Sequence, residues 1–157
     1  MTKIILFVTF LLPWLSLLFA SKETIKTYMP VTIFTSLLMT IIFQIAYTYE
    51  WWVIYQYIVP WGYMSDVSFT YGIFAIGTFW IYVFTSHKFP LYVGVNLVTD
   101  AAMAFGVLPL LGVMGIAEYK NILPGQYFLV IFALSFVIYV YHKWQKGIFT
   151  TETRREA

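Results

Sequence analysis

One acid, Asp100, lies near the middle of the apolar stretch FPLYVGVNLVTDAAMAFGVLPLLGVMGIAE, which runs from Phe89 to Glu118. Asn96 precedes it by four residues, so the amide and the carboxyl group share one face of a helix. An isolated ionised carboxylate in an apolar setting costs several kcal/mol, and Asp100 must therefore be protonated, paired or hydrated. An acid within a membrane span is by default a functional hypothesis, here permeation or proton transfer. The alternatives are a structural polar clamp between helices and a contact with a partner.

The surroundings of Asp100 are set by a composition that excludes an ordinary water-soluble domain. Of the 157 residues, 61% are hydrophobic and 10% are charged, whereas soluble domains carry about 25% charged residues. The net charge is only +2 and no basic helix is present, which argues against a nucleic-acid partner. We therefore expect an all-α integral membrane bundle whose partner is the lipid bilayer.

Five apolar runs are long enough to cross a bilayer as helices. They cover about residues 4–20, 31–49, 67–86, 90–116 and 124–142, and a polar tail follows over 143–157. A cleavable signal peptide is the alternative for the first run, but that run is longer than a typical signal core and has Leu18 where a small residue is needed. Pro30 is expected in the first turn of its helix, and Pro109 is expected to kink the long fourth helix. Gly72 and Gly77 would allow close helix approach.

The distribution of basic residues predicts the orientation of the bundle. If the amino terminus lies outside, seven of the nine basic residues fall on the cytoplasmic side. Those seven are Lys22, Lys26, Lys88, Lys143, Lys146, Arg154 and Arg155, against Lys3 and Lys120 outside. The positive-inside rule thus favours an external amino terminus and a cytoplasmic carboxyl terminus.

A polar stripe marks the second span, where Ser36, Thr40 and Gln44 recur at steps of four residues. Lipid offers such groups no hydrogen bonds, so the stripe should face other protein. Thr40 and Asp100 should lie at similar depth, because both spans run outward from the cytoplasmic side. The expected arrangement is a polar seam between the second and fourth helices, with Asp100 neutral or hydrated and bonded to Asn96.

The segment 50–66 is expected to be an interfacial or re-entrant link with a turn at Pro60-Trp61-Gly62. Glu50 and Asp66 bracket it and could form a cation-attracting mouth, although acids often only mark where helices leave the bilayer. Its tryptophans, Trp51, Trp52 and Trp61, suit an aromatic belt at headgroup depth. The alternative is an aromatic platform for a sugar or a lipid headgroup.

No motif of a known enzyme class or metal site is present. The chain lacks cysteine, and His87 and His142 have no acids at ligand spacing, so we expect helix-end roles for both and no cofactor. Catalytic signatures such as GxSxG or HExxH are missing as well. An enzyme is the class that the residues support least.

The stretch around Asn96, Asp100 and Pro109-Leu110-Leu111 resembles a family of small multi-pass membrane proteins from Bacillus-like and clostridial spore-forming bacteria. That family often carries an Asn-x-x-x-Asp pair followed by Pro-Leu-Leu, and it is uncharacterised. The resemblance implies a bacterial plasma-membrane location and no particular activity. Three hypotheses for function follow from the residues: small-solute or ion transport, with or without coupling to protons; a scaffold or accessory subunit; and a lipid- or glycan-binding module. We expect a homo-oligomer or a membrane-protein partner.

Overall fold

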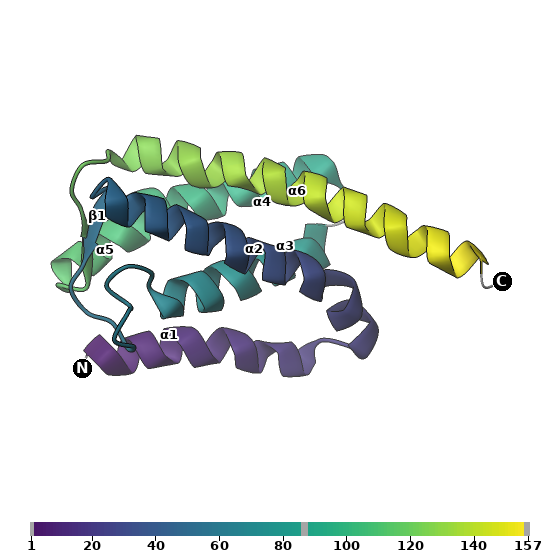
Figure 1. Ribbon diagram of the computed structural model, residues 1–157, viewed down its shortest axis with the longest axis horizontal. Coiled ribbons are helices and arrows are strands. Elements are labelled where there is room, and N and C mark those ends of the chain that lie inside the picture. The colour runs from purple at the N-terminus through teal and green to yellow at the C-terminus, as the bar shows by residue number, and fades with distance from the viewer. Residues whose placement is uncertain (1, 86–87, 156–157) are drawn as a thin grey trace.

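The computed structural model describes residues 2–85 and 88–155, with side chains described as far as Ile148. Within these residues, five helices are long and apolar enough to cross a membrane, as the sequence predicts. Figure 1 shows them side by side, with the two ends of the chain at opposite ends of the bundle. This arrangement is the one expected for an odd number of spans.

The helical elements follow the chain in order, and two of them contain π-helical turns. They are α1 (Thr2–Ser16) with a 3₁₀ turn (Leu17–Phe19), α2 (Lys22–Thr48), a π-helix (Ser68–Phe74) leading into α3 (Ala75–Thr85), α4 (Phe89–Ala102), a second π-helix (Met103–Val107) leading into α5 (Leu108–Val113), and α6 (Pro124–Arg155). The expected last residue of the third span, Ser86, lies outside the described residues, as does His87.

The second helix begins much earlier than expected. Ser21 caps it, with its hydroxyl accepting a hydrogen bond from the Thr24 backbone N–H at 3.2 Å, and this cap starts the helix at Lys22. Pro30 therefore lies inside α2 and not in its first turn, so that prediction was wrong. The sixth helix likewise continues beyond residue 142, into the segment expected as a polar tail, and ends at Arg155.

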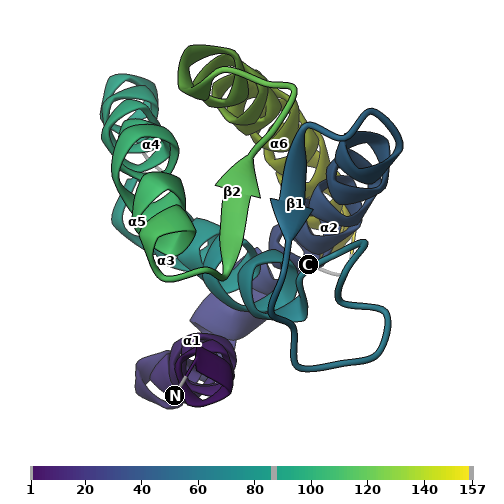
Figure 2. The same ribbon diagram turned by 90° about the vertical axis from the view of Figure 1, so that its left-hand side faces the viewer.

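The prediction of an all-α protein was also incomplete, because two short strands pair at one end of the bundle. Strands β1 (Trp52–Ile54) and β2 (Ala117–Tyr119) form an antiparallel ribbon with Val53 opposite Glu118. Figure 2 looks onto this end and shows the ribbon lying across it, between α5 on one side and α2 and α6 on the other. The expected turn near residue 61 is present, since the Gly62 N–H donates to the Val59 carbonyl.

Helix α1 packs against the π-helix that precedes α3, and Gly72 makes this approach possible. A Cβ at Gly72 would lie 2.8 Å from the Thr9 carbonyl oxygen, too close for any other residue without a backbone shift. The Trp14 indole N–H donates to the Tyr71 carbonyl at 2.9 Å across the same contact. Gly77, by contrast, has open space where its Cβ would be. The predicted close approach therefore holds for Gly72 alone.

Candidate functional site

Asp100 lies on α4, near the middle of the 25-residue apolar helix Phe89–Val113. Its side chain is half-buried, and its Oδ2 atom is shielded from solvent without a hydrogen-bond partner among the described residues. The expected bond to Asn96 is not formed, because the Asn96 amide donates to the Tyr92 carbonyl of its own helix at 2.8 Å.

The polar stripe of α2 stays largely with its own helix. The Ser36 and Thr40 hydroxyls donate to backbone carbonyls four residues earlier, and Gln44 is exposed. Among the described residues, the one hydrogen bond from the stripe to another element joins the Thr40 and Tyr71 hydroxyls, at 3.0 Å. Steps of four residues turn by about 40° each, so the stripe rotates away from any single neighbour.

Helices α2 and α4 do not form the expected two-helix seam. Helix α2 packs mainly against α3, its π-helix and α6, and α4 packs mainly against α3, α6 and its own π-helix. No hydrogen bond between described residues joins Asp100 to Ser36, Thr40 or Gln44. The structure therefore leaves the acid without the neutral polar partners that the sequence suggested.

A π-helical turn begins three residues after Asp100 and explains how Pro109 is accommodated. The Leu108 N–H donates to the Met103 carbonyl, one residue further back than in an α-helix. Continuing that pattern, the Ala104 carbonyl would need an N–H from position 109, which proline lacks. The Tyr119 hydroxyl from β2 fills this gap, at 2.7 Å from the Ala104 oxygen. The sequence predicted a helix distortion at Pro109, but it did not indicate that the Tyr119 hydroxyl would bond to the Ala104 carbonyl left without an N–H.

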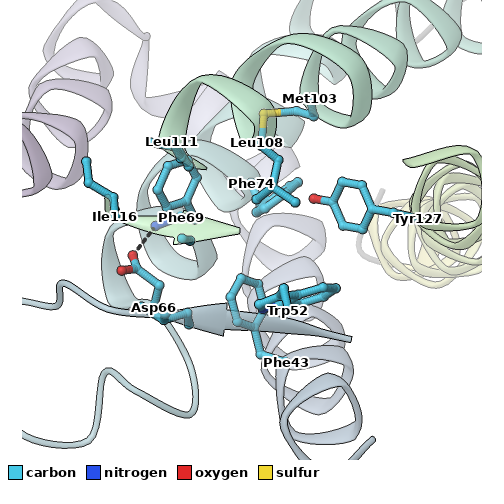
Figure 3. A pocket seen from close by; sticks show the side chains of 12 residues that line it. Phe43, Trp52, Asp66, Phe69, Phe74, Met103, Leu108, Leu111, Ile116 and Tyr127 are labelled. Carbon is cyan, nitrogen blue, oxygen red and sulfur yellow. Dashed lines mark hydrogen bonds between the residues drawn. The ribbon is translucent and has the colours of Figure 1, made fainter. Parts of the chain in front are cut away.

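A small cavity lies beneath the ribbon, between α2, α5, α6 and the two π-helices, Ser68–Phe74 and Met103–Val107. Its volume is ≈ 30 Å³, and its walls are Phe43, Trp52, Ile54, Asp66, Phe69, Phe74, Met103, Leu108, Leu111, Ile116, Ala117 and Tyr127. Figure 3 shows the Tyr127 hydroxyl pointing toward the middle of these side chains, with Asp66 at the opposite side. Trp52 packs edge-on against Phe43 and Tyr127, with ring centroids 5.3 and 5.5 Å apart.

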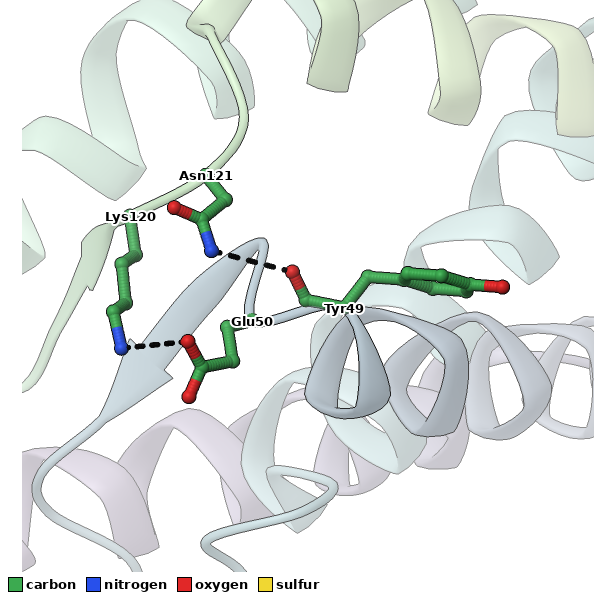
Figure 4. A network of polar contacts seen from close by, with 4 residues as sticks. All are labelled: Tyr49, Glu50, Lys120 and Asn121. Carbon is green, nitrogen blue, oxygen red and sulfur yellow. Dashed lines mark hydrogen bonds and ion pairs between the residues drawn. The ribbon is translucent and has the colours of Figure 1, made fainter.

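The structure gives Glu50 and Asp66 separate partners, and they do not face each other as an open mouth. Glu50 is exposed and forms an ion pair with Lys120 at 2.8 Å, beside the contact from Asn121 to the Tyr49 carbonyl (Figure 4). Its positive φ of 52° marks the sharp turn out of α2. Exposed pairs of this kind contribute little to stability.

Asp66 is 4% exposed and lies just before the third span, Ser68–Thr85. Its Oδ1 atom accepts a hydrogen bond from the Phe69 N–H at 3.0 Å, as a helix cap does. Burial raises the pKa of the Asp66 carboxyl group, while hydrogen bonds from the Phe69 and Ser68 backbone oppose that shift. Asp66 is thus a buried acid whose main hydrogen bond is made with the backbone.

The three tryptophans do not form one platform. Trp52 is buried in the cavity wall, Trp51 is half-buried and stacks on Tyr49, and Trp61 is 62% exposed. The Trp51 and Trp52 rings contact each other, with centroids 6.1 Å apart, but they are tilted by 58° and do not present one flat face. The exposed Trp61 and its neighbouring tyrosines still suit an aromatic belt at headgroup depth.

His142 is not at a helix end, so the expected capping role was wrong for this residue. It lies inside α6, is buried, and packs against the Tyr82 ring with centroids 4.4 Å apart. Its Nδ1 atom has no hydrogen-bond partner among the described residues. The described part of the chain holds no group of three His, Cys, Asp or Glu residues that could bind a metal ion.

Comparison with known proteins adds no assignment to this geometry. No protein family, no curated protein and no solved structure matches the chain. The resemblance to the membrane proteins of spore-forming bacteria therefore stays a prediction. The site has to be interpreted from its own residues.

Proposed function

We propose that this chain moves a small solute or ion across a membrane, with Asp100 as the proton- or cation-sensing group. The observation that carries the proposal is the Asp100 Oδ2 atom, which is shielded from solvent inside an apolar helix without a hydrogen-bond partner among the described residues. Leaving a buried polar atom unpaired costs about 1–3 kcal/mol. A buried group that lowers the stability of the fold without forming a structural contact is best explained by the binding of a proton, an ion or a water molecule to it.

The neighbourhood of Asp100 supports the same proposal. The adjoining π-helix changes the helical hydrogen-bond pattern at this depth, a feature often found at functional sites.

We place the ribbon end outside the cell and the carboxyl terminus in the cytoplasm, in a bacterial plasma membrane. The support is the excess of lysine and arginine in the segments assigned to the cytoplasm. Cysteine substitutions at exposed Trp61 and at exposed Lys143 test it, through labelling of intact cells with a membrane-impermeant thiol reagent. Labelling at position 61 alone is expected, and labelling at position 143 alone would reverse the orientation.

Flux into proteoliposomes tests the function. Wild-type protein is reconstituted with an internal pH-sensitive dye, and proton movement is followed after a pH gradient is imposed, with and without sodium or potassium. Asp100→Asn should nearly abolish flux, while Thr99→Val, which removes an exposed neighbouring hydroxyl, should leave it intact. Absence of flux in the wild-type protein under every gradient, or full flux in Asp100→Asn, would overturn the proposal.

The second candidate function is an accessory subunit, and the same unpaired atom favours it. A donor from a neighbouring membrane helix, in a partner or a second copy, could bind the Asp100 Oδ2 atom. The mass of the detergent-solubilised protein discriminates the two candidates. An oligomer that dissociates on Asp100→Asn substitution, in a wild-type protein without flux, would favour the accessory role.

A further inference from the structure

A second site is built around the cavity beneath the ribbon, apart from Asp100. Five of its lining residues are aromatic: Phe43, Trp52, Phe69, Phe74 and Tyr127. A sixth, Asp66, is an acid and is 4% exposed. Apolar walls alone would suit any small apolar molecule, but an acid among aromatic faces selects for positive charge.

The charged residues of the surrounding segments also favour a positively charged ligand. Residues 49–66 and 114–123, which form the loops and strands at this end, contain Glu50, Asp66 and Glu118, and the basic residues expected on the same side are Lys3 and Lys120. An excess of acids raises the local concentration of cations near the site. Lys120 is already paired with Glu50, so it does not neutralise Asp66.

The size of the cavity limits the cation. At about 10–15 Å³ for each water-sized molecule, a volume of ≈ 30 Å³ holds two or three non-hydrogen atoms. Aromatic faces attract ammonium groups and also contact methyl groups favourably, and desolvation strengthens the attraction. A strongly hydrated inorganic cation would lose its water against these walls with one carboxylate in return.

We propose that this cavity binds a small alkylammonium ion, of the size of methylammonium or dimethylammonium, with the Trp52 and Tyr127 rings around the cation and Asp66 as its counter-ion. The site is independent of transport through Asp100. If the protein binds methylammonium but shows no flux, the binding site stands and the transport proposal fails. If it shows flux but does not bind methylammonium, the binding site fails and the transport proposal stands.

The test is binding of methylammonium chloride to purified protein in detergent, read as a shift in Tm and as a change in tryptophan fluorescence at constant ionic strength. Asp66→Asn keeps an oxygen for the helix cap and removes the charge, so it should weaken binding by about tenfold or more without unfolding the protein. Trp52→Leu should also weaken binding. Glu50→Gln and Trp61→Leu change an exposed acid and an exposed tryptophan at the same end, and both should bind as the wild-type protein does.

Uncharged methanol and potassium chloride are the ligand controls. Neither should reproduce the methylammonium response. A wild-type response to methanol of the same size would show an apolar cavity without charge preference, and an equal response to potassium would show a general cation effect. Either result, or unchanged binding in a folded Asp66→Asn protein, would overturn the proposal.

Discussion

Asp66 and Asp100 are two shielded acids of one small membrane protein, and their surroundings differ in kind. Asp66 lies at the ribbon end, where the Phe69 backbone N–H donates to it at the start of a helix. Asp100 lies inside a helix whose own N–H groups are already engaged, and its Oδ2 atom has no partner among the described residues. A buried acid at a helix start explains itself structurally, whereas one in mid-helix does not. For this reason we assign the proposed transport role to Asp100 and a counter-ion role to Asp66.

The largest effect on stability is expected when the helix cap at Asp66 is removed. Asp66→Ala should lower the free energy of unfolding by about 1–2 kcal/mol, because the buried Phe69 N–H loses its acceptor. Asp66→Asn should restore most of the loss. Denaturant titration in detergent measures both, and an Asp66→Ala protein as stable as the wild type would show that the cap contributes nothing.

The neighbourhood of Asp100 contains one group whose removal should be costly. Tyr119→Phe removes the hydroxyl that satisfies the Ala104 carbonyl, and it should cost about 1 kcal/mol or somewhat more. Tyr55→Phe is a matched control, because its hydroxyl bonds to Glu118 at the exposed edge of the ribbon. If both variants lose the same stability in thermal melts, the role of Tyr119 in supporting the π-helix is refuted.

The pH dependence of stability tests whether Asp66 is a buried acid with a raised pKa. Burial raises the pKa of Asp66 above its ordinary value of 3.8, so the folded protein holds this proton more tightly than the unfolded chain does. The resulting stabilisation is full below pH 3.8 and is lost as the pH rises through the folded pKa. The stability of Asp66→Asn relative to the wild type should therefore increase over that range. A constant difference between the two proteins across the acidic range would contradict a raised pKa.

The smallest effect on stability is expected at Asp100 itself. Because Oδ2 makes no hydrogen bond that substitution could break, Asp100→Asn should change the free energy of unfolding by no more than about 0.5 kcal/mol. Thermal unfolding of the variant beside the wild type measures this change. A loss above about 1 kcal/mol would mean that Asp100 is a structural clamp, and the contrast with Asp66 would disappear.

Much of the outline of the fold was predictable from residue patterns. Long apolar runs have few alternatives to membrane helices, because every backbone polar group must be satisfied within the lipid. The five spans were therefore found within a few residues, except at the start of α2 and at the end of α6. The start of α2 shows the limit of such predictions. The Thr24 N–H donates to the Ser21 hydroxyl, and this cap starts α2 at Lys22, whereas the sequence had suggested a start near Pro30.

The sequence by itself predicted five helices long and apolar enough to cross a membrane, with an acid inside the fourth. Only the tertiary structure decided which groups surround that acid, that β1 and β2 pair, and that Trp52, Asp66 and Tyr127 line one cavity. The physical reason is sequence separation. Helix formation in lipid depends on neighbours a few residues apart, whereas the contact from Tyr119 to Ala104 and the pairing of residues 52–54 with 117–119 depend on how whole helices pack.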